Sequence, residues 1–219
     1  MAANKQGLSS LLEVDIYGIT AEEYSMGRSN IEVVARMIEA GIRVIQYREK
    51  EKSDREKYEE CLKIRELTRV AGVTFIVNDR VDLAMLVGAD GIHLGQDDLP
   101  PQAVREMVGG EMFIGLSTHS PAQAEAAVRL GVDYIGVGPI FATNTKKDVC
   151  APVSLEYLDY VVKNIRLPFV ALGGIKEHNI AEVYRRGARC IALVTEIVGA
   201  PDIGAKVRAL RKAIREKSS

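Results

Sequence analysis

The amino-acid sequence predicts an α/β fold, a single-domain (β/α)8 TIM barrel. Eight short runs rich in β-branched residues alternate with stretches of helical periodicity along the 219 residues. The mean repeat is roughly 25 residues, which is compact for a barrel whose usual length is about 250 residues. Polar or glycine clusters follow nearly every run, and no GxGxxG fingerprint follows the first one. Both features favour the barrel over an open doubly wound sheet with a single switch point.

The apolar runs predict the eight strands. In chain order they are residues 14–20, 43–48, 74–78, 91–95, 113–117, 134–139, 168–172 and 190–194. Residues 14–219 are expected to form the one barrel domain. Residues 1–13 are expected to be a polar, partly ordered lead-in.

Capping residues and apolar spacing predict the helices between these strands. Ser29 should precede the first helix and Gly41 end it, a second should begin near Ser53, and Pro100 and Pro101 should initiate a later one. A short helix is expected over residues 81–87. The residues expected to face the core are Ile31, Val34, Ala35 and Ile38, then Cys61, Ile64, Leu67, Thr68 and Ala71, then Ala124, Ala127 and Val128, and finally Ile203, Val207, Leu210 and Ile214.

The composition is that of an ordinary globular protein with one core, with 47% hydrophobic and 27% charged residues. A formal net charge of −1 offers no field for nucleic acid or an anionic membrane, so a bound anion must be held by local basic groups. No apolar run reaches membrane-spanning length, and residues 1–13 lack the apolar core of a signal peptide. We therefore expect a cytoplasmic protein whose three separated cysteines are reduced. The sequence leaves open whether the chain forms a homo-oligomer.

In a (β/α)8 barrel, the residues just past the C-terminal end of each strand share one rim, where active sites lie. Here those positions are unusually rich in basic, acidic and small polar residues. They are Gln46, Arg48, Lys50, Asn78, Asp79, Gln96, Asp97, Asp98, Ser117, Thr118, His119, Thr143, Thr145, Lys146, Gly173, Gly174, Val194 and Thr195.

Two carboxylates at this rim predict a metal site. Asp79 and Asp98 follow successive parallel strands and can hold a Mg²⁺ ion that bridges a diphosphate, while Arg48, Lys50 and Lys146 face its oxygens. The simpler alternative is that the two aspartates cap the helices that follow them. Their recurrence beside basic residues favours the metal.

A second anion site is predicted across the barrel. Backbone N–H groups of Gly174, Val194 and Thr195 lie after the seventh and eighth runs, where barrels commonly form a phosphate cradle. Two anion sites imply two phosphorylated ligands. The one held with metal looks like an activated electrophile with a diphosphate leaving group.

Six motifs in this order resemble the thiamine phosphate synthase family. They are QYREK (46–50), NDR (78–80), HLGQDD (93–98), GLSTHS (115–120), GPIFATNTKKD (138–148) and GGI (173–175), which together span nearly the whole chain. The resemblance implies that hydroxymethylpyrimidine diphosphate is joined to thiazole phosphate, with release of diphosphate. It also implies dissociation of the diphosphate to a pyrimidine cation, which the thiazole nitrogen captures.

The resemblance assigns the site residues as follows. The pyrimidine diphosphate would contact Gln46, Tyr47, Arg48, Glu49, Lys50, Asn78, Ser117 and Lys146, of which Arg48, Ser117 and Lys146 would act in catalysis; Mg²⁺ would bind Asp79 and Asp98; and the thiazole phosphate would contact Thr143, Asn144, Thr145, Gly174, Val194 and Thr195. Ala142 and Thr195 differ from the residues common in the family at their positions, which bears on fine geometry only.

Three other functions remain open at this stage. A thiazole tautomerase of the same barrel family would need a histidine acid/base, for which His119 is the candidate. A Schiff-base aldolase would use Lys146, which sits in a polar loop rather than an apolar pocket. A barrel that only binds a phosphorylated metabolite is the non-enzymatic alternative. His93, within an apolar run, is expected to be a packed core residue.

Overall fold

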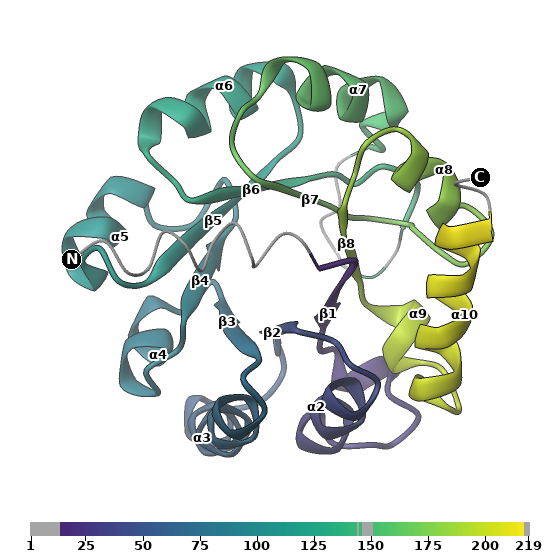
Figure 1. Ribbon diagram of the computed structural model, residues 1–219. Coiled ribbons are helices and arrows are strands. Elements are labelled where there is room, and N and C mark those ends of the chain that lie inside the picture. Colours follow the sequence, from purple (N-terminus) through teal and green to yellow (C-terminus); the bar gives the residue numbers. More distant parts are fainter. Residues whose placement is uncertain (1–13, 144, 146–150, 217–219) are drawn as a thin grey trace.

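The computed structural model describes residues 14–143, 145 and 151–216 and contains a closed barrel of eight parallel strands, so the predicted fold is confirmed (Figure 1). The strands are β1 (Ile16–Ile19), β2 (Val44–Tyr47), β3 (Thr74–Asn78), β4 (Gly91–Leu94), β5 (Phe113–Thr118), β6 (Tyr134–Val137), β7 (Phe169–Ala171) and β8 (Cys190–Leu193). Each lies within two residues of its expected bounds. The expected lead-in, residues 1–13, lies outside the described residues.

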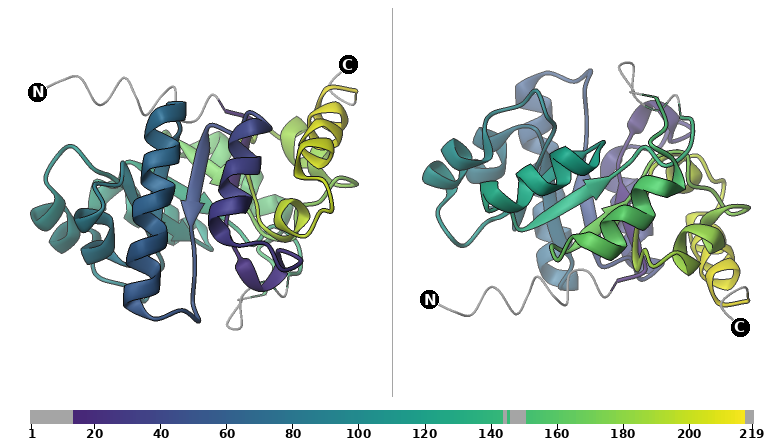
Figure 2. Two further views of the ribbon diagram at one scale, coloured as in Figure 1. Left: turned by 90° about the horizontal axis from the view of Figure 1, so that it is seen from below. Right: turned by 90° about the horizontal axis from the view of Figure 1, so that it is seen from above.

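The helices surround the barrel. They are the 3-10 helix η1 (Glu22–Tyr24) and the α-helices α2 (Asn30–Glu39), α3 (Asp54–Ala71), α4 (Val81–Leu86), α5 (Pro101–Val108), α6 (Pro121–Leu130), α7 (Ser154–Asn164), α8 (Ile180–Arg185), α9 (Thr195–Val198) and α10 (Ile203–Glu216). Figure 2 shows α2 and α3 side by side along the outside of the strands. Among the described residues, no helix is both long and apolar enough to cross a membrane.

Pairing between the first and last strands closes the sheet. Ile16 is in register with Ile191, and Gly18 with Leu193. Every strand therefore has two neighbours, and no edge is left to pair with another chain. Closure also places all eight strand C-termini at one end.

The predicted helix starts are confirmed, but two predicted inner faces are partly wrong. Ser29 and Ser53 accept the third-residue N–H groups of α2 and α3. In α2 the fully buried residues include Val33 and Met37 rather than Ala35. The buried stripe is shifted by one residue and begins at Asn30, which is fully buried and donates to Glu49 and Glu60.

The second error concerns α6, where Val128 is 47% exposed. Ala124 and Ala127 are buried as expected, and each has 0% exposure. Two alanines allow a close approach of the helix to the sheet. The larger valine lies one position further around the helix and faces solvent.

The barrel interior combines bulky side chains with glycines. Tyr17, Phe113 and Tyr134 fill the interior from β1, β5 and β6. A Cβ atom added to Gly115 would lie 2.2 Å from Cζ of Tyr134. The aromatic ring on β6 therefore fits only because the neighbouring strand carries glycine at that point.

Three arginine–aspartate pairs tie helices to the end of the barrel where the strands begin. In each, an aspartate just before a strand accepts a strand backbone N–H and binds an arginine from a helix. The pairs are Asp15 with Arg211, Asp90 with Arg65 and Asp133 with Arg105, and the N–H groups are those of Ile16, Phe75 and Ile114. These pairs lie at the N-terminal ends of the strands, where barrel residues serve stability rather than catalysis.

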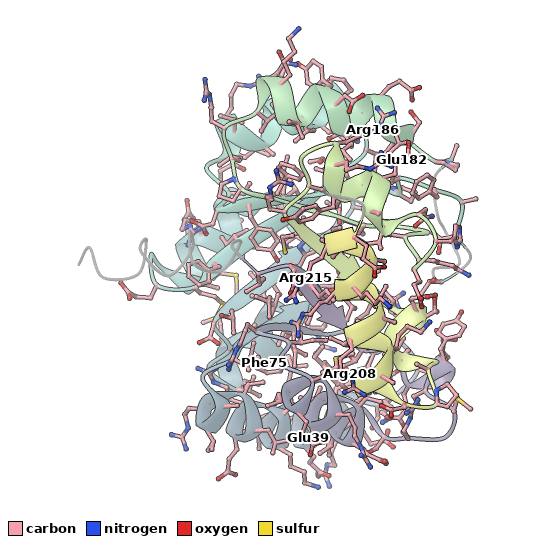
Figure 3. The ribbon with its side chains drawn as sticks, turned by 45° about the vertical axis from the view of Figure 1, so that its right-hand side comes forward. Glu39, Phe75, Glu182, Arg186, Arg208 and Arg215 are labelled. Atoms are coloured by element: carbon pink, nitrogen blue, oxygen red, sulfur yellow. The ribbon has the colours of Figure 1, made fainter. Side chains whose placement is uncertain are left out.

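The arginines of α10 differ in direction. Arg211 turns inward to Asp15, with its Nε atom 2.7 Å from the carboxylate, and also donates to the carbonyls of Ala40 and Gly41. Arg208 and Arg215, labelled beside the same helix in Figure 3, are exposed to solvent. Arg211 thus adds a polar link to the start of the barrel, beside the buried apolar stripe by which the last helix packs on the core.

We expect Gly115→Ala to destabilise the fold by about 1–3 kcal/mol, because the added methyl group overpacks the interior against Tyr134. The measurement is the free energy of unfolding from denaturant titration. Gly110→Ala is the matched control, since a Cβ there meets nothing within 4 Å. Equal stability of the two variants would contradict the packing described for Tyr134.

Candidate active site

A cavity of about 790 Å³ opens at the C-terminal ends of the strands. All eight strands, or the loops directly after them, contribute to its wall. The predicted site residues that line it are Gln46, Arg48, Lys50, Asn78, Asp79, Ser117, Thr143, Thr145, Gly174, Val194 and Thr195. Closure of the barrel therefore brings together residues that lie up to 149 positions apart in the sequence.

Five predicted site residues are not found in this wall. Asn144 and Lys146 lie outside the described residues. The Tyr47 hydroxyl donates to Glu60 at 2.7 Å, because alternation along β2 turns its side chain to the outside of the barrel. Glu49 and Asp98 lie next to the wall and contact residues that do line it.

A tight turn after β3 positions Asp79. Its φ angle is +61°, in the left-handed region that asparagine and aspartate tolerate better than other non-glycine residues. The N–H of Asp79 donates to the His93 carbonyl, and the N–H of Arg80 donates back to the Asn78 carbonyl at 2.7 Å. This turn directs the Asp79 carboxylate to the rim, where Lys50 Nζ lies 2.5 Å from its Oδ2 atom.

Asp79 and Asp98 form a hydrogen-bonded pair with opposite pKa shifts. Burial opposes ionisation of Asp79, but the hydrogen bond and charge of Lys50 outweigh it, so the pKa of Asp79 lies below its usual value. Burial and the neighbouring Asp79 carboxylate raise the pKa of Asp98. Neither residue caps a helix, because the N-caps of α4 and α5 are Arg80 and Pro100.

The donor set of this pair fits a hard divalent cation. Two carboxylates close enough to share a hydrogen bond repel each other when both are ionised, and a cation between them would relieve that repulsion. Among the described residues, no group of three or more histidine, cysteine, aspartate or glutamate side chains could hold a metal. Two carboxylates with water and substrate phosphate are the usual coordination of Mg²⁺ in phosphate-handling sites.

Glu49 organises the loop that carries the basic residues. Its Oε1 atom accepts the N–H groups of Lys50 at 2.8 Å and Glu51 at 3.0 Å, and its Oε2 atom accepts Asn30 Nδ2 at 3.1 Å. On the other side, the Thr20 hydroxyl accepts the Arg48 N–H at 2.9 Å. The loop is held from both sides, which leaves Arg48 and Lys50 on the cavity wall.

The residues predicted to form a phosphate cradle lie on the opposite wall. Gly173 and Gly174 have φ angles of +92° and +62°. A Cβ atom on Gly174 would lie 2.6 Å from the Ala142 carbonyl oxygen. No hydrogen bond from the Gly174 N–H to another described residue is found, and Thr195 begins α9, so its N–H lacks an intrahelical acceptor. Backbone donors in this arrangement can bind an anion.

The role of His93 was only partly visible in the sequence. It is 8% exposed, as a core residue would be, but it also lines the cavity, and its Nε2 atom lies 2.9 Å from Ser117 Oγ. Tyr17, from β1, also lines the cavity floor and was not predicted. The period-two alternation of β4 and β1 could have identified both as inward-facing, but not their partners.

Three comparisons with known proteins agree. A sequence model of the family described as "Thiamine monophosphate synthase" matches residues 16–197. The chain is 79% identical over 213 residues to a thiamine-phosphate synthase of Pelotomaculum thermopropionicum, covering 97% of this chain and 98% of the relative. It is 57% identical over 205 residues to a thiamine-phosphate synthase of Lawsonia intracellularis, covering 94% of each.

The fold is also similar to a solved structure, the thiamine phosphate pyrophosphorylase from Pyrococcus furiosus. The TM-score is 0.85 at 34% sequence identity, covering 95% of this chain and 98% of that one. Residues 16–197, which the family model matches, include every strand of the barrel and the residues of the cavity wall. The chain therefore belongs to the thiamine monophosphate synthase family.

Proposed function

We propose that this chain is a thiamine-phosphate synthase, a transferase that joins hydroxymethylpyrimidine diphosphate to thiazole phosphate and releases diphosphate. The observation that supports the proposal is one cavity with basic and carboxylate side chains on one wall and backbone N–H groups on the opposite wall. Lys50 and Asp79 lie on one wall with Asp98 beside it, and the Gly174 and Thr195 backbone lies on the other. Such a cavity suits two phosphorylated substrates that must meet face to face.

On the first wall, Arg48 and Lys50 would bind the diphosphate oxygens. Asp79 and Asp98 would hold Mg²⁺, which when bound supplies positive charge to the leaving diphosphate. Lys50 Nζ lies 2.5 Å from the Asp79 carboxylate, so the diphosphate would compete with Asp79 for the charge of this lysine. The site would thus stabilise the negative charge that develops as the carbon–oxygen bond breaks.

No side chain needs to act as a nucleophile in this reaction. The bond from the pyrimidine methylene carbon to diphosphate oxygen breaks, and a bond from that carbon to the thiazole nitrogen forms. Because water would compete for the carbon, the floor must exclude it. Ile19, Val170, Leu172 and Ala192 line that floor with apolar surface.

The alternative functions have less support. A tautomerase would use His119, which lines the cavity with its Nδ1 atom beside the Gly138 carbonyl. It would leave Lys50, Asp79 and Asp98 without a role. The aldolase candidate, Lys146, lies outside the described residues.

The decisive experiment is formation of thiamine phosphate from the two phosphorylated substrates, with and without Mg²⁺. Absence of product despite binding of thiazole phosphate would refute the synthase. Cytoplasmic location stays a prediction.

We expect Asp79→Asn to lower kcat by about 10²–10³-fold, the cost of removing one group that stabilises developing charge. Asparagine tolerates the left-handed φ angle of this position, so the turn and the fold should be retained. The measurements are steady-state kinetics across a Mg²⁺ titration and, without substrate, Mn²⁺ binding by electron paramagnetic resonance. Both metal binding and rate should fall.

Asp82→Asn is the control for this prediction. Asp82 lies three residues further on and pairs with Arg80 on the outer surface, with 59% of its side chain exposed. Its substitution should leave the Mg²⁺ dependence unchanged. Wild-type metal affinity in Asp79→Asn would contradict the proposed ligand role.

We expect Gly174→Ala to raise the KM for thiazole phosphate about tenfold or more, because the methyl group would collide with the Ala142 carbonyl and displace the backbone donors. The KM for the pyrimidine diphosphate should change little. Gly72→Ala is the control, since Gly72 has a φ angle of +63° but no atom within 4 Å of a Cβ. If both variants changed KM alike, general backbone strain rather than the cradle would be responsible.

A further inference from the structure

A chain of hydrogen-bonded side chains crosses the barrel interior and forms part of the cavity floor. Gln46 Nε2 lies 2.9 Å from the Tyr17 hydroxyl, which lies 3.3 Å from the Tyr134 hydroxyl. Tyr134 in turn lies 3.0 Å from His93 Nδ1, and His93 Nε2 lies 2.9 Å from Ser117 Oγ. The five residues come from β2, β1, β6, β4 and β5.

The chain is shielded from water. Gln46, Tyr17, Tyr134 and His93 are each at most 8% exposed. Burial, the largest effect on each, raises the pKa of Tyr17 and of Tyr134, so both hydroxyls remain protonated in the physiological range. Each tyrosine therefore has one proton to donate and an oxygen that accepts. Buried polar groups at this depth must satisfy one another.

The amide of Gln46 sets the direction of the first bond. An amide NH2 group can only donate, so Tyr17 accepts from Gln46. Either hydroxyl could donate between the two tyrosines, and a single direction along the chain would have Tyr17 donate to Tyr134. Tyr134 then donates to Nδ1 of His93. A neutral imidazole that accepts at Nδ1 carries its proton on Nε2, and that proton is donated to Ser117 Oγ.

We propose that Tyr17, Tyr134 and His93 are positioning residues that fix the direction of the hydrogen bond at Ser117. With its oxygen accepting from His93, the Ser117 hydroxyl directs its proton into the cavity that it lines. Ser117 is thereby held as a donor toward the pyrimidine substrate. The inference rests on the proposed function for its substrate, but the bond directions within the protein do not depend on it.

The geometry of the barrel is consistent with a dedicated role for the chain. The other residues of the interior cluster are apolar or a buried thiol. Gly115 makes room for the Tyr134 ring, and the rings of His93 and Tyr134 lie 5.5 Å apart at 38°. A fully apolar interior would not require these paired donors and acceptors, so the polar chain needs a reason beyond filling space.

The first test needs no substrate. Long-range ¹H–¹⁵N NMR of the full-length protein with ¹⁵N-labelled histidine reports which ring nitrogen carries the proton. Signals that persist in both His119→Gln and His178→Gln variants belong to His93. We expect the Nε2–H tautomer in the wild type and a mixture of tautomers in Tyr134→Phe. The Nδ1–H tautomer, or protons on both nitrogens, in the wild type would overturn the proposal.

The second test is a kinetic double-mutant cycle. We expect Tyr134→Phe to lower kcat/KM for the pyrimidine diphosphate about 3- to 10-fold, the scale of one misdirected hydrogen bond, without changing the KM for thiazole phosphate. In a Ser117→Ala background this loss should disappear, because the group being positioned is gone. Tyr17→Phe should have a smaller effect, since its 3.3 Å link is the longest in the chain.

Tyr157→Phe is the matched control. Tyr157 is also buried and donates one hydroxyl hydrogen bond, at 2.7 Å, to Thr118, the neighbour of Ser117, but it lies outside the chain. Its stability loss should resemble that of Tyr134→Phe, while kcat/KM should change less than about twofold. Equal kinetic effects of the two variants, or a Tyr134→Phe loss that persists without the Ser117 hydroxyl, would refute positioning. Absence of thiamine phosphate from every protein would refute the function instead and leave the NMR result to stand.

Discussion

Alternation of side chains along eight closed parallel strands is the constraint on which the rest of this structure depends. Every second side chain must enter one narrow interior, so a bulky group on one strand requires a small one on its neighbour, as Tyr134 does with Gly115. Polar groups sent inward have no water to bind and must pair with one another. The hydrogen-bonded series from Gln46 to Ser117 follows from this rule.

The same constraint divides a contiguous motif into different tasks. Along residues 46–50, Gln46 faces the interior, while Tyr47 faces outward and binds Glu60. Beyond the strand end, Glu49 holds the loop backbone and Lys50 reaches Asp79. The five consecutive residues of this motif therefore have different roles. Some would touch a ligand, and the others hold those residues in place.

The polar residues at the two ends of the barrel differ in their effect on stability. At the N-terminal end, three aspartates each satisfy a strand amide and bind an arginine, which fastens helices to the sheet. At the C-terminal end, Asp79 and Gly174 adopt left-handed backbone conformations, and two carboxylates face each other. Such features cost stability, and proteins retain them where the surrounding structure can support them.

The sequence by itself determined the fold class, the order and approximate bounds of the eight strands, and eleven of the residues on the cavity wall, because strand alternation and the position of strand ends are local properties. It placed Asp79, Lys50 and Gly174 at one rim for that reason.

Only the tertiary structure decided which inward residues touch. His93 reads as a core residue in its own strand, and its contacts with Tyr134 and Ser117 arise from strands 41 and 24 residues away. The burial of Asn30 and the contact of the Tyr47 hydroxyl with Glu60 likewise depend on neighbours distant in sequence. Local periodicity specifies whether a side chain points into or out of the barrel. A contact also depends on which side chain of another strand lies opposite, and only closure of the barrel decides that.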